Sequence, residues 1–315
     1  AALGGYVALL APAALAAREK GLPIVNIAQP FKASGMMLTC LKESGITDPK
    51  TDFKGKTLGV WFFGNEYPFL SWMNHLGLKT DGGPEGVTVL KQGFNVDPLL
   101  QKQAACISTM TYNEYGQVLD AGLKPEDLMT FKYEDQGVAT LEDGLYVLEA
   151  KLAEPGMEDR LVRFVRASMK GWKYAEEHPE EAAAIVLEND ETGAQTEAHQ
   201  LRMAEEVAKL TAGSNGALDP ADAERTVETL LSGGSDPVAS TRVLDASARA
   251  PGRRETETAL SLAERMPRLI LEARRVAATL AEAEREGRQG QNGDQGGHED
   301  GPKSRPPSGY QRLGV

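Results

Sequence analysis

The sequence predicts a mixed α/β protein, and three observations support this fold class. Short apolar runs bounded by turn residues alternate with helix-spaced stretches up to about residue 150. From residue 157 onward, the apolar residues recur at helical spacing instead. The composition, 41% apolar and 25% charged, is that of an ordinary globular protein. The alternation favours a mostly parallel sheet, and a strand-rich front before a helical back indicates two lobes.

The first part of the chain is expected to contain strands and short helices in alternation. A helix over 12–20 has Pro12 at its first position and Gly21 behind it as a stop. The residues after the strand at 57–61 have helical spacing over 70–77, and 98–103 is a short helix that Asp97 caps. Residues 48–56 are a polar connector. The apolar runs predict strands over 22–29, 35–41, 57–61, 87–90, 104–109, 128–133 and 144–148.

Four helices are expected after residue 157. The first is marked by apolar residues at helical spacing up to Trp172, and the second begins at Pro179. A third spans about 195–210, and Asp219 precedes the fourth, which ends before 233–234. Residues 238–286 are expected to form a helical extension. Residues 287–315 are rich in Gly, Gln, Asp, Pro and Ser, which predicts a disordered tail.

The net charge of −12 argues against nucleic acid or an anionic membrane surface as a partner. Cys40 and Cys106 form no C-x-x-C pair and the four histidines are scattered, so no metal site is expected. Two buried thiols are favoured. No apolar run reaches the roughly 18 residues that a membrane-spanning helix needs. The chain starts at alanine, and we expect that an N-terminal part of the native protein precedes it.

Candidate binding residues follow two of the predicted strands. The first group comes after the strand at 57–61 and the second after the strand at 104–109. Side chains that follow parallel strands collect at one rim of a sheet, where open α/β sheets bind ligands. Aromatic rings among Asn and Glu suit a flat, nitrogen-rich small molecule. The candidates are Trp61, Gly64, Asn65, Glu66 and Tyr67 in the first group, and Tyr112, Asn113, Glu114 and Tyr115 in the second.

Each of these residues also has a structural interpretation. Trp61 and Tyr67 suit core packing, and Asn65 and Glu66 suit a solvated turn. The second group suits the N-cap and first turn of a helix. Tyr67 and Tyr115 would have to face one cavity for the binding interpretation to hold.

Six segments resemble the solute-binding proteins of bacterial ABC importers. They are residues 13–21 (AALAAREKG), 55–60 (GKTLGV), 64–68 (GNEYP), 111–115 (TYNEY), 137–144 (GVATLEDG) and 164–172 (FVRASMKGW). The branch that they resemble contains the thiamine-pyrimidine, taurine and nitrate binding proteins, together with the fungal pyrimidine synthase. The resemblance covers about residues 12–238.

The resemblance implies a two-lobed periplasmic binding protein of type II. Residues 1–42 and 135–237 would form lobe 1, without the first strand and helix of the family, and residues 43–134 would form lobe 2. Glu142, beside the return crossover, would contact the ligand or the hinge. The extension at 238–286 and the tail at 287–315 depart from the family pattern.

The implied function is that of a periplasmic solute-binding component of an ABC importer. Such a protein binds a small ligand as a monomer, closes by hinge bending and delivers the ligand to a permease in the inner membrane. The expected ligand is a thiamine-precursor pyrimidine. An enzyme of the pyrimidine synthase type and a binder of a sulfonate or nitrate anion remain as alternatives. No catalytic residue and no cofactor are expected, because the sequence lacks a cysteine cluster and a nucleophile elbow.

Overall fold

Two separate β-sheets organise the computed structural model, which describes residues 6–233. The smaller sheet has the strand order β1–β8–β2, and β8 runs antiparallel to both neighbours. The expected strands at 22–29 and 144–148 are confirmed, whereas the first strand was not predicted. The bounds are Tyr6–Leu9 for β1, Ile24–Ala28 for β2 and Gly144–Leu148 for β8.

The larger sheet has the strand order β5–β4–β6–β3–β7. Strand β4 runs parallel to β5 and β6, but β3 runs antiparallel to β6 and β7. The prediction of a mostly parallel sheet is therefore wrong for the smaller sheet and only partly right for the larger one. The strands are β3 (Met36–Leu41), β4 (Thr57–Val60), β5 (Thr88–Lys91), β6 (Cys106–Met110) and β7 (Leu128–Lys132).

The reversed strands have a common cause. Strand β3 is the first strand after the chain crosses to the larger sheet, and β8 is the first after it returns. The chain enters each sheet from the side that faces the other sheet. The neighbouring strands run toward that side, so the entering strand is antiparallel to them. A helical crossover, which would restore the parallel direction, is absent at these two points.

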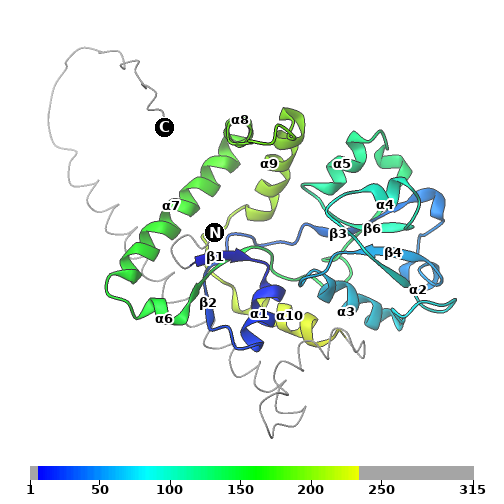
Figure 1. Cartoon of the computed structure of the whole chain (residues 1–315), viewed down its shortest axis with the longest axis horizontal. Coiled ribbons are helices and arrows are strands. Elements are labelled where there is room, and N and C mark those ends of the chain that lie inside the picture. The colour runs from blue at the N-terminus through cyan, green and yellow to red at the C-terminus, as the bar shows by residue number, and fades with distance from the viewer. Residues whose placement is uncertain (1–5, 234–315) are drawn as a thin grey trace, which may run out of the picture.

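The helices divide between the two sheets (Figure 1). In the first part, α1 spans Ala11–Glu19, α2 Pro49–Asp52, α3 Glu66–Leu76, α4 Asp97–Leu100 and α5 Glu114–Asp120. Short 3₁₀ turns lie at Lys42–Ser44 and Pro125–Asp127. In the second part, α6 spans Glu149–Leu152, α7 Met157–Glu177, α8 Pro179–Glu188, α9 Glu197–Thr211 and α10 Pro220–Leu231.

Some helix starts follow the residues that mark them in the sequence, and others do not. Helix α1 begins at Ala11, so Pro12 is its second residue and not its first. Pro179 begins α8, and the Asp219 side chain accepts a hydrogen bond from the backbone of Ala221 at the start of α10. Asp97 is not the cap of α4: the cap position is occupied by Val96, and Asp97 is already in the first turn. An acid in the first turn stabilises a helix through its dipole, so the same residue type fits either place.

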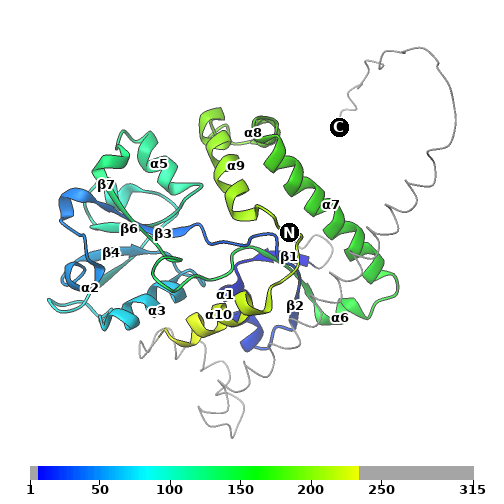
Figure 2. The same cartoon turned by 180° about the vertical axis from the view of Figure 1, so that it is seen from behind.

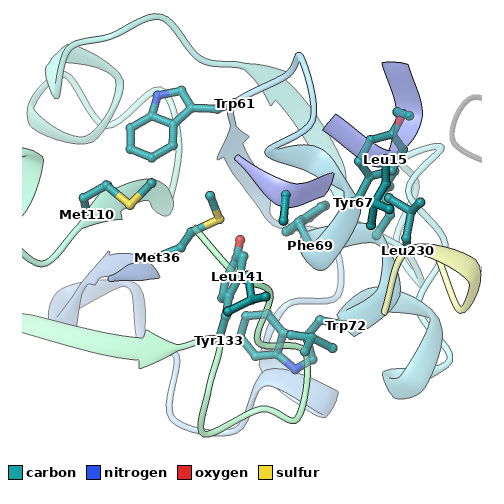
Figure 3. Packing of buried hydrophobic residues seen from close by; sticks show 14 of the residues in the cluster. Leu15, Met36, Trp61, Tyr67, Phe69, Trp72, Met110, Tyr133, Leu141 and Leu230 are labelled. Carbon is teal, nitrogen blue, oxygen red and sulfur yellow. The ribbon is translucent and has the colours of Figure 1, made fainter. Parts of the chain in front are cut away.

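Two apolar clusters lie on opposite faces of the larger sheet. Alternate residues of β3 divide between them, with Leu38 in the first cluster and Leu41 in the second. The first cluster continues into the smaller sheet and includes the fully buried Trp72 beneath α3 (Figure 3). The second lies under α4 and α5 and includes Leu99 and Val118. The helices after β4 and β6 therefore cover different faces.

A disulfide joins β3 to β6. The Sγ atoms of Cys40 and Cys106 are bonded, and these two residues are direct partners in the antiparallel register. The prediction of two buried thiols is wrong. Both residues are fully buried, as expected, but 66 residues separate them along the chain. Only the strand register, which the sequence does not give, brings them face to face.

The chain passes twice between the sheets, before β3 and after β7. We call the smaller sheet with α1 and α6–α10 the first lobe, and the larger sheet with α2–α5 the second lobe (Figures 1 and 2). The expected boundary after residue 42 would assign β3 to the first lobe, but its pairing with β6 and β7 places it in the second. The extension at 238–286 and the tail at 287–315 lie outside the described residues. Within the described part, no helix has the length and apolar character required to cross a bilayer.

Candidate functional site

The rings of Trp61 and Tyr67 pack in the apolar core. Trp61 is 4% exposed, and its indole N–H donates to the carbonyl of Gly93 at 3.0 Å. Tyr67 is 6% exposed and lies beside Leu15 and Leu230 in the first cluster (Figure 3). A ring surrounded by core side chains has no free face for stacking, so these positions favour the structural interpretation of both residues.

The turn between β4 and α3 is held by its own polar groups. The Glu66 carboxylate accepts a hydrogen bond from the Gly64 N–H at 2.7 Å, and the Asn65 amide donates to the carbonyl of Phe62 at 3.1 Å. Gly64 has φ +110° and lies against α1, where a Cβ atom would be 2.8 Å from Cβ of Ala13. This turn therefore forms a contact between the lobes and leaves no room for a side chain at position 64.

Three residues of the second group, Asn113, Glu114 and Tyr115, form the start of α5. The Glu114 carboxylate accepts from the Met110 N–H at 3.0 Å and from the Asn113 amide at 2.8 Å. Asn113 also contacts His199 of α9, with 3.0 Å between Oδ1 and Nε2. Tyr115 packs against the second apolar cluster. Tyr112 differs from these three residues because it lies at the crossovers.

Tyr67 and Tyr115 do not face a common cavity. Each is the second residue of the helix that follows its strand, but α3 covers one face of the larger sheet and α5 covers the other. The two rings therefore pack in different clusters. The expectation that they would line one site is not met, so the structure does not support the binding interpretation of these two rings. The residues that do converge are found at the crossovers.

Glu142 lies where the two crossover segments meet. Its Oε1 atom accepts hydrogen bonds from the N–H of Gly35 and from the Ser34 hydroxyl, the latter at 3.0 Å. Its Oε2 atom is buried and has no hydrogen-bond partner, and the residue as a whole is 2% exposed. Buried carboxylate oxygens are almost always paired, so an open one marks a place where a further donor can bind.

Two side chains of the second lobe approach the same point. A Cβ atom at Gly35 would lie 3.0 Å from Oγ1 of Thr111 and 3.1 Å from the Tyr112 ring. The Thr111 hydroxyl is itself buried without a partner. Glycine at position 35 thus lets β6, the first crossover and the return crossover meet closely. Two unpaired polar atoms lie near this glycine: Oε2 of Glu142 on the return crossover and Oγ1 of Thr111 after β6.

Burial dominates the electrostatics of this site. Desolvation raises the pKa of Glu142 to about 7, although the hydrogen bonds from Gly35 and Ser34 act in the opposite direction. Burial also raises the pKa of Asp143. The pKa of the Tyr112 phenol is raised by burial and then by the nearby carboxylates of Glu142, Asp143 and Glu114. The site is therefore rich in hydrogen-bond acceptors and disfavours a second negative charge.

Gln29 connects the crossovers to each other. It is fully buried, and its amide donates to the carbonyl oxygens of Glu142 at 3.0 Å and Asp143 at 3.3 Å. The backbone N–H of Ser34 donates to the Glu134 carboxylate at 2.7 Å. These bonds hold the two connecting segments side by side, as a hinge between two lobes requires.

Comparison with known proteins assigns the chain to a family. Residues 9–182 match the family described as NMT1/THI5 like. The chain belongs to this family. It is 27% identical over 184 residues to the formylaminopyrimidine-binding protein of Halalkalibacterium halodurans, a match that covers 57% of this chain and 53% of the relative. The NMT1/THI5-like chain thus spans about half the length of that curated relative, which is named as a binding protein and not as an enzyme.

Solved structures support the fold of this NMT1/THI5-like protein. The periplasmic aliphatic sulphonate binding protein of Escherichia coli superposes with a TM-score of 0.53 at 13% identity, over 81% of this chain and 74% of that one. A Candida albicans protein described as having the generic periplasmic binding protein fold gives a TM-score of 0.50 at 19% identity, over 77% and 78% of the two chains. The two-lobed periplasmic binding protein fold is therefore confirmed.

Sequence reasoning found part of the crossover site. Tyr112 was predicted as a ligand contact and Glu142 as a contact of the ligand or the hinge, and both lie at the crossovers. Ser34, Gly35 and Thr111 were not singled out. A Ser-Gly pair directly before a buried strand is a turn signal, and it could have marked position 35 as a close backbone approach. Thr111 precedes Tyr112 and carries no separate signal.

Proposed function

We propose that this protein is the extracytoplasmic solute-binding component of an ABC importer and binds a nitrogen-rich ligand related to the thiamine-precursor pyrimidine. It works as a monomer in the periplasm and delivers the ligand to a permease in the inner membrane. Membership of the NMT1/THI5-like family and similarity to a formylaminopyrimidine-binding protein support the proposal. The observation that carries it is the unpaired, buried Oε2 atom of Glu142 between the lobes.

The chemistry of this oxygen suits an aminopyrimidine. Gly35 and Ser34 occupy Oε1, so Oε2 is left to interact with a ligand. As a carboxylate it accepts an N–H from the exocyclic amino group, and as an acid it donates to a ring nitrogen. With a pKa of about 7, Glu142 can take either form near neutral pH. The Thr111 hydroxyl offers a second donor or acceptor to the same ligand.

The position of the site at the crossovers provides a mechanism for closure. Glu142 belongs to the return crossover and Thr111 follows β6 of the second lobe. A ligand that hydrogen-bonds to both stabilises the arrangement in which they are close together. Binding therefore shifts the equilibrium between open and closed forms toward the closed one.

The two alternatives are less well supported by the site. A sulfonate or nitrate would have to lie beside Glu142 and Asp143, whose ionised forms repel an anion. The sulphonate-binding structural neighbour shares the fold at low identity, and the fold does not determine the ligand. A synthase of the fungal type uses a cysteine-rich loop, but the two cysteines of this chain are buried in a disulfide.

Titration calorimetry with formylaminopyrimidine tests the proposal. We expect binding by the unmodified chain and a loss of roughly 10- to 100-fold in affinity for Glu142→Gln, because the variant cannot offer an acceptor at both oxygens. Thr111→Val, which keeps the shape and removes the hydroxyl, should weaken binding by about 5- to 10-fold. The matched control is Glu126→Gln, an exposed residue after α5 that should bind as the unmodified chain does.

Taurine and nitrate are measured in the same way. Binding of either anion without binding of the pyrimidine would contradict the proposal. If Glu142→Gln and Thr111→Val both bind the pyrimidine as tightly as the unmodified chain does, the proposed ligand class stands. The ligand would then not bind at the crossovers.

A further inference from the structure

Helices α5 and α9 meet through four polar side chains, which we call the α5–α9 bridge: Asn113, Asp120, His199 and Arg202. Helix α9 lies on the side of the first lobe that faces α5 (Figures 1 and 2). The Arg202 guanidinium donates to both carboxylate oxygens of Asp120, at 3.0 Å each. His199 contacts Asn113 through Nε2 and Asp120 through Nδ1. Because Asn113 and Asp120 belong to the second lobe, the bridge is a further link between the lobes.

Both nitrogens of the His199 ring face oxygen acceptors. Oδ1 of Asn113 is 3.0 Å from Nε2, and Oδ2 of Asp120 is 3.4 Å from Nδ1. The orientation of the Asn113 amide is fixed, since its NH₂ group donates to Glu114 and its oxygen also accepts from Gln117 at 3.1 Å. The oxygen therefore points toward His199. A neutral imidazole has one N–H and can satisfy one of its two neighbours, whereas an imidazolium has two and satisfies both.

Charged side chains lie around the ring. Glu114 of α5 and Asp120 attract an imidazolium, and Arg202 on the same helix as His199 repels it. The hydrogen bonds from Arg202 hold the pKa of Asp120 below its ordinary range, so this carboxylate stays ionised in mild acid. His199 is 8% exposed, which limits screening of its contacts by solvent.

We propose that the α5–α9 bridge is a proton-dependent clasp between the lobes, in which protonated His199 favours the closed form and neutral His199 loosens it. This inference rests on the proposed opening and closing of the lobes and adds a control of that motion that is independent of the ligand site. Imidazole side chains change charge between about pH 5 and pH 8. A small acidification would then prolong retention of a bound solute.

Energy transfer between dyes on the two lobes tests the clasp in the full chain without ligand. The dyes are attached through Glu126→Cys in the second lobe and Glu191→Cys in the first, both exposed positions. We expect higher transfer efficiency at about pH 5.5 than at about pH 8, with the ratio of closed to open forms changing roughly fivefold. His199→Gln, which keeps the contact with Asn113 but cannot gain charge, should abolish the pH dependence.

His75→Gln is the matched control, because His75 is an exposed histidine on α3 and its loss should leave the pH dependence intact. Asp120→Asn is a second variant that retains His199 and should reduce the dependence. Transfer that does not change with pH in the unmodified chain, or that changes equally in His199→Gln, would overturn the clasp. The energy-transfer experiment contains no ligand, so it can be interpreted even if the chain does not bind a pyrimidine. Normal pyrimidine binding together with a transfer efficiency that does not depend on pH would exclude the clasp and leave the proposed function intact.

Discussion

Replacing Glu142 by Gln should stabilise the fold in a pH-dependent way. In the unfolded chain this carboxyl has an ordinary pKa of 4.5, and in the folded protein burial raises it to about 7. Below pH 4.5 the group is protonated in both states and burial costs little. As pH rises from 4.5 to 7, the folded state binds more protons than the unfolded state, so stability falls across this window and then levels off.

The size of the effect follows from the two pKa values. The gap between about 7 and 4.5, at about 1.4 kcal/mol for each pH unit, amounts to about 3 kcal/mol. Gln keeps an oxygen that accepts from Gly35 and Ser34 and has no charge to bury. The variant should therefore avoid this loss, and any cost of its unpaired NH₂ group should be the same at every pH.

Urea unfolding of both proteins at about pH 4.5 and about pH 8 measures this difference. We expect the free energy of unfolding of Glu142→Gln, relative to the unmodified chain, to rise by about 3 kcal/mol between the two pH values. Glu126→Gln, at an exposed position, should show no comparable change. A difference between the two proteins that is equal at both pH values would refute the claim that Glu142 is buried with an elevated pKa.

Three further changes test other parts of the structure. Gly35→Ala places a methyl group 3.0 Å from Thr111 and Leu210, so ligand affinity should fall by about tenfold in calorimetry while circular dichroism is unchanged. An equal affinity would mean that the crossovers are looser than the structure shows. The double variant Cys40→Ser, Cys106→Ser removes a link across 66 residues and should cost about 2 to 4 kcal/mol in urea unfolding, with the unmodified chain losing a similar amount in reductant. No loss in either experiment would argue that the bond is absent. Gly64→Ala adds a methyl group 2.8 Å from Ala13 at a positive φ, and should lower the unfolding free energy by at least about 1 kcal/mol. Gly137→Ala, which also has a positive φ but meets no neighbour, separates the backbone strain from the clash.

The sequence determined most of the elements, although it did not predict β1 or α2. The apolar runs that predict strands at 35–41 and 104–109 correspond to β3 and β6, and proline and aspartate marked the starts of α8 and α10. The resemblance gave the fold and pointed to Glu142. Apolar periodicity depends on neighbouring residues along the chain, so it can be recognised without knowledge of the tertiary structure.

The tertiary structure decided which of these elements meet. Tyr67 and Tyr115 have equivalent positions in the sequence pattern, yet α3 and α5 cover opposite faces of the larger sheet and separate the rings. Cys40 and Cys106 pair only because β3 and β6 align in one register. The unpaired oxygen of Glu142 likewise results from contacts between segments about a hundred residues apart. Strand order, register and the face that a helix covers depend on long-range packing, and no local pattern in the sequence encodes them.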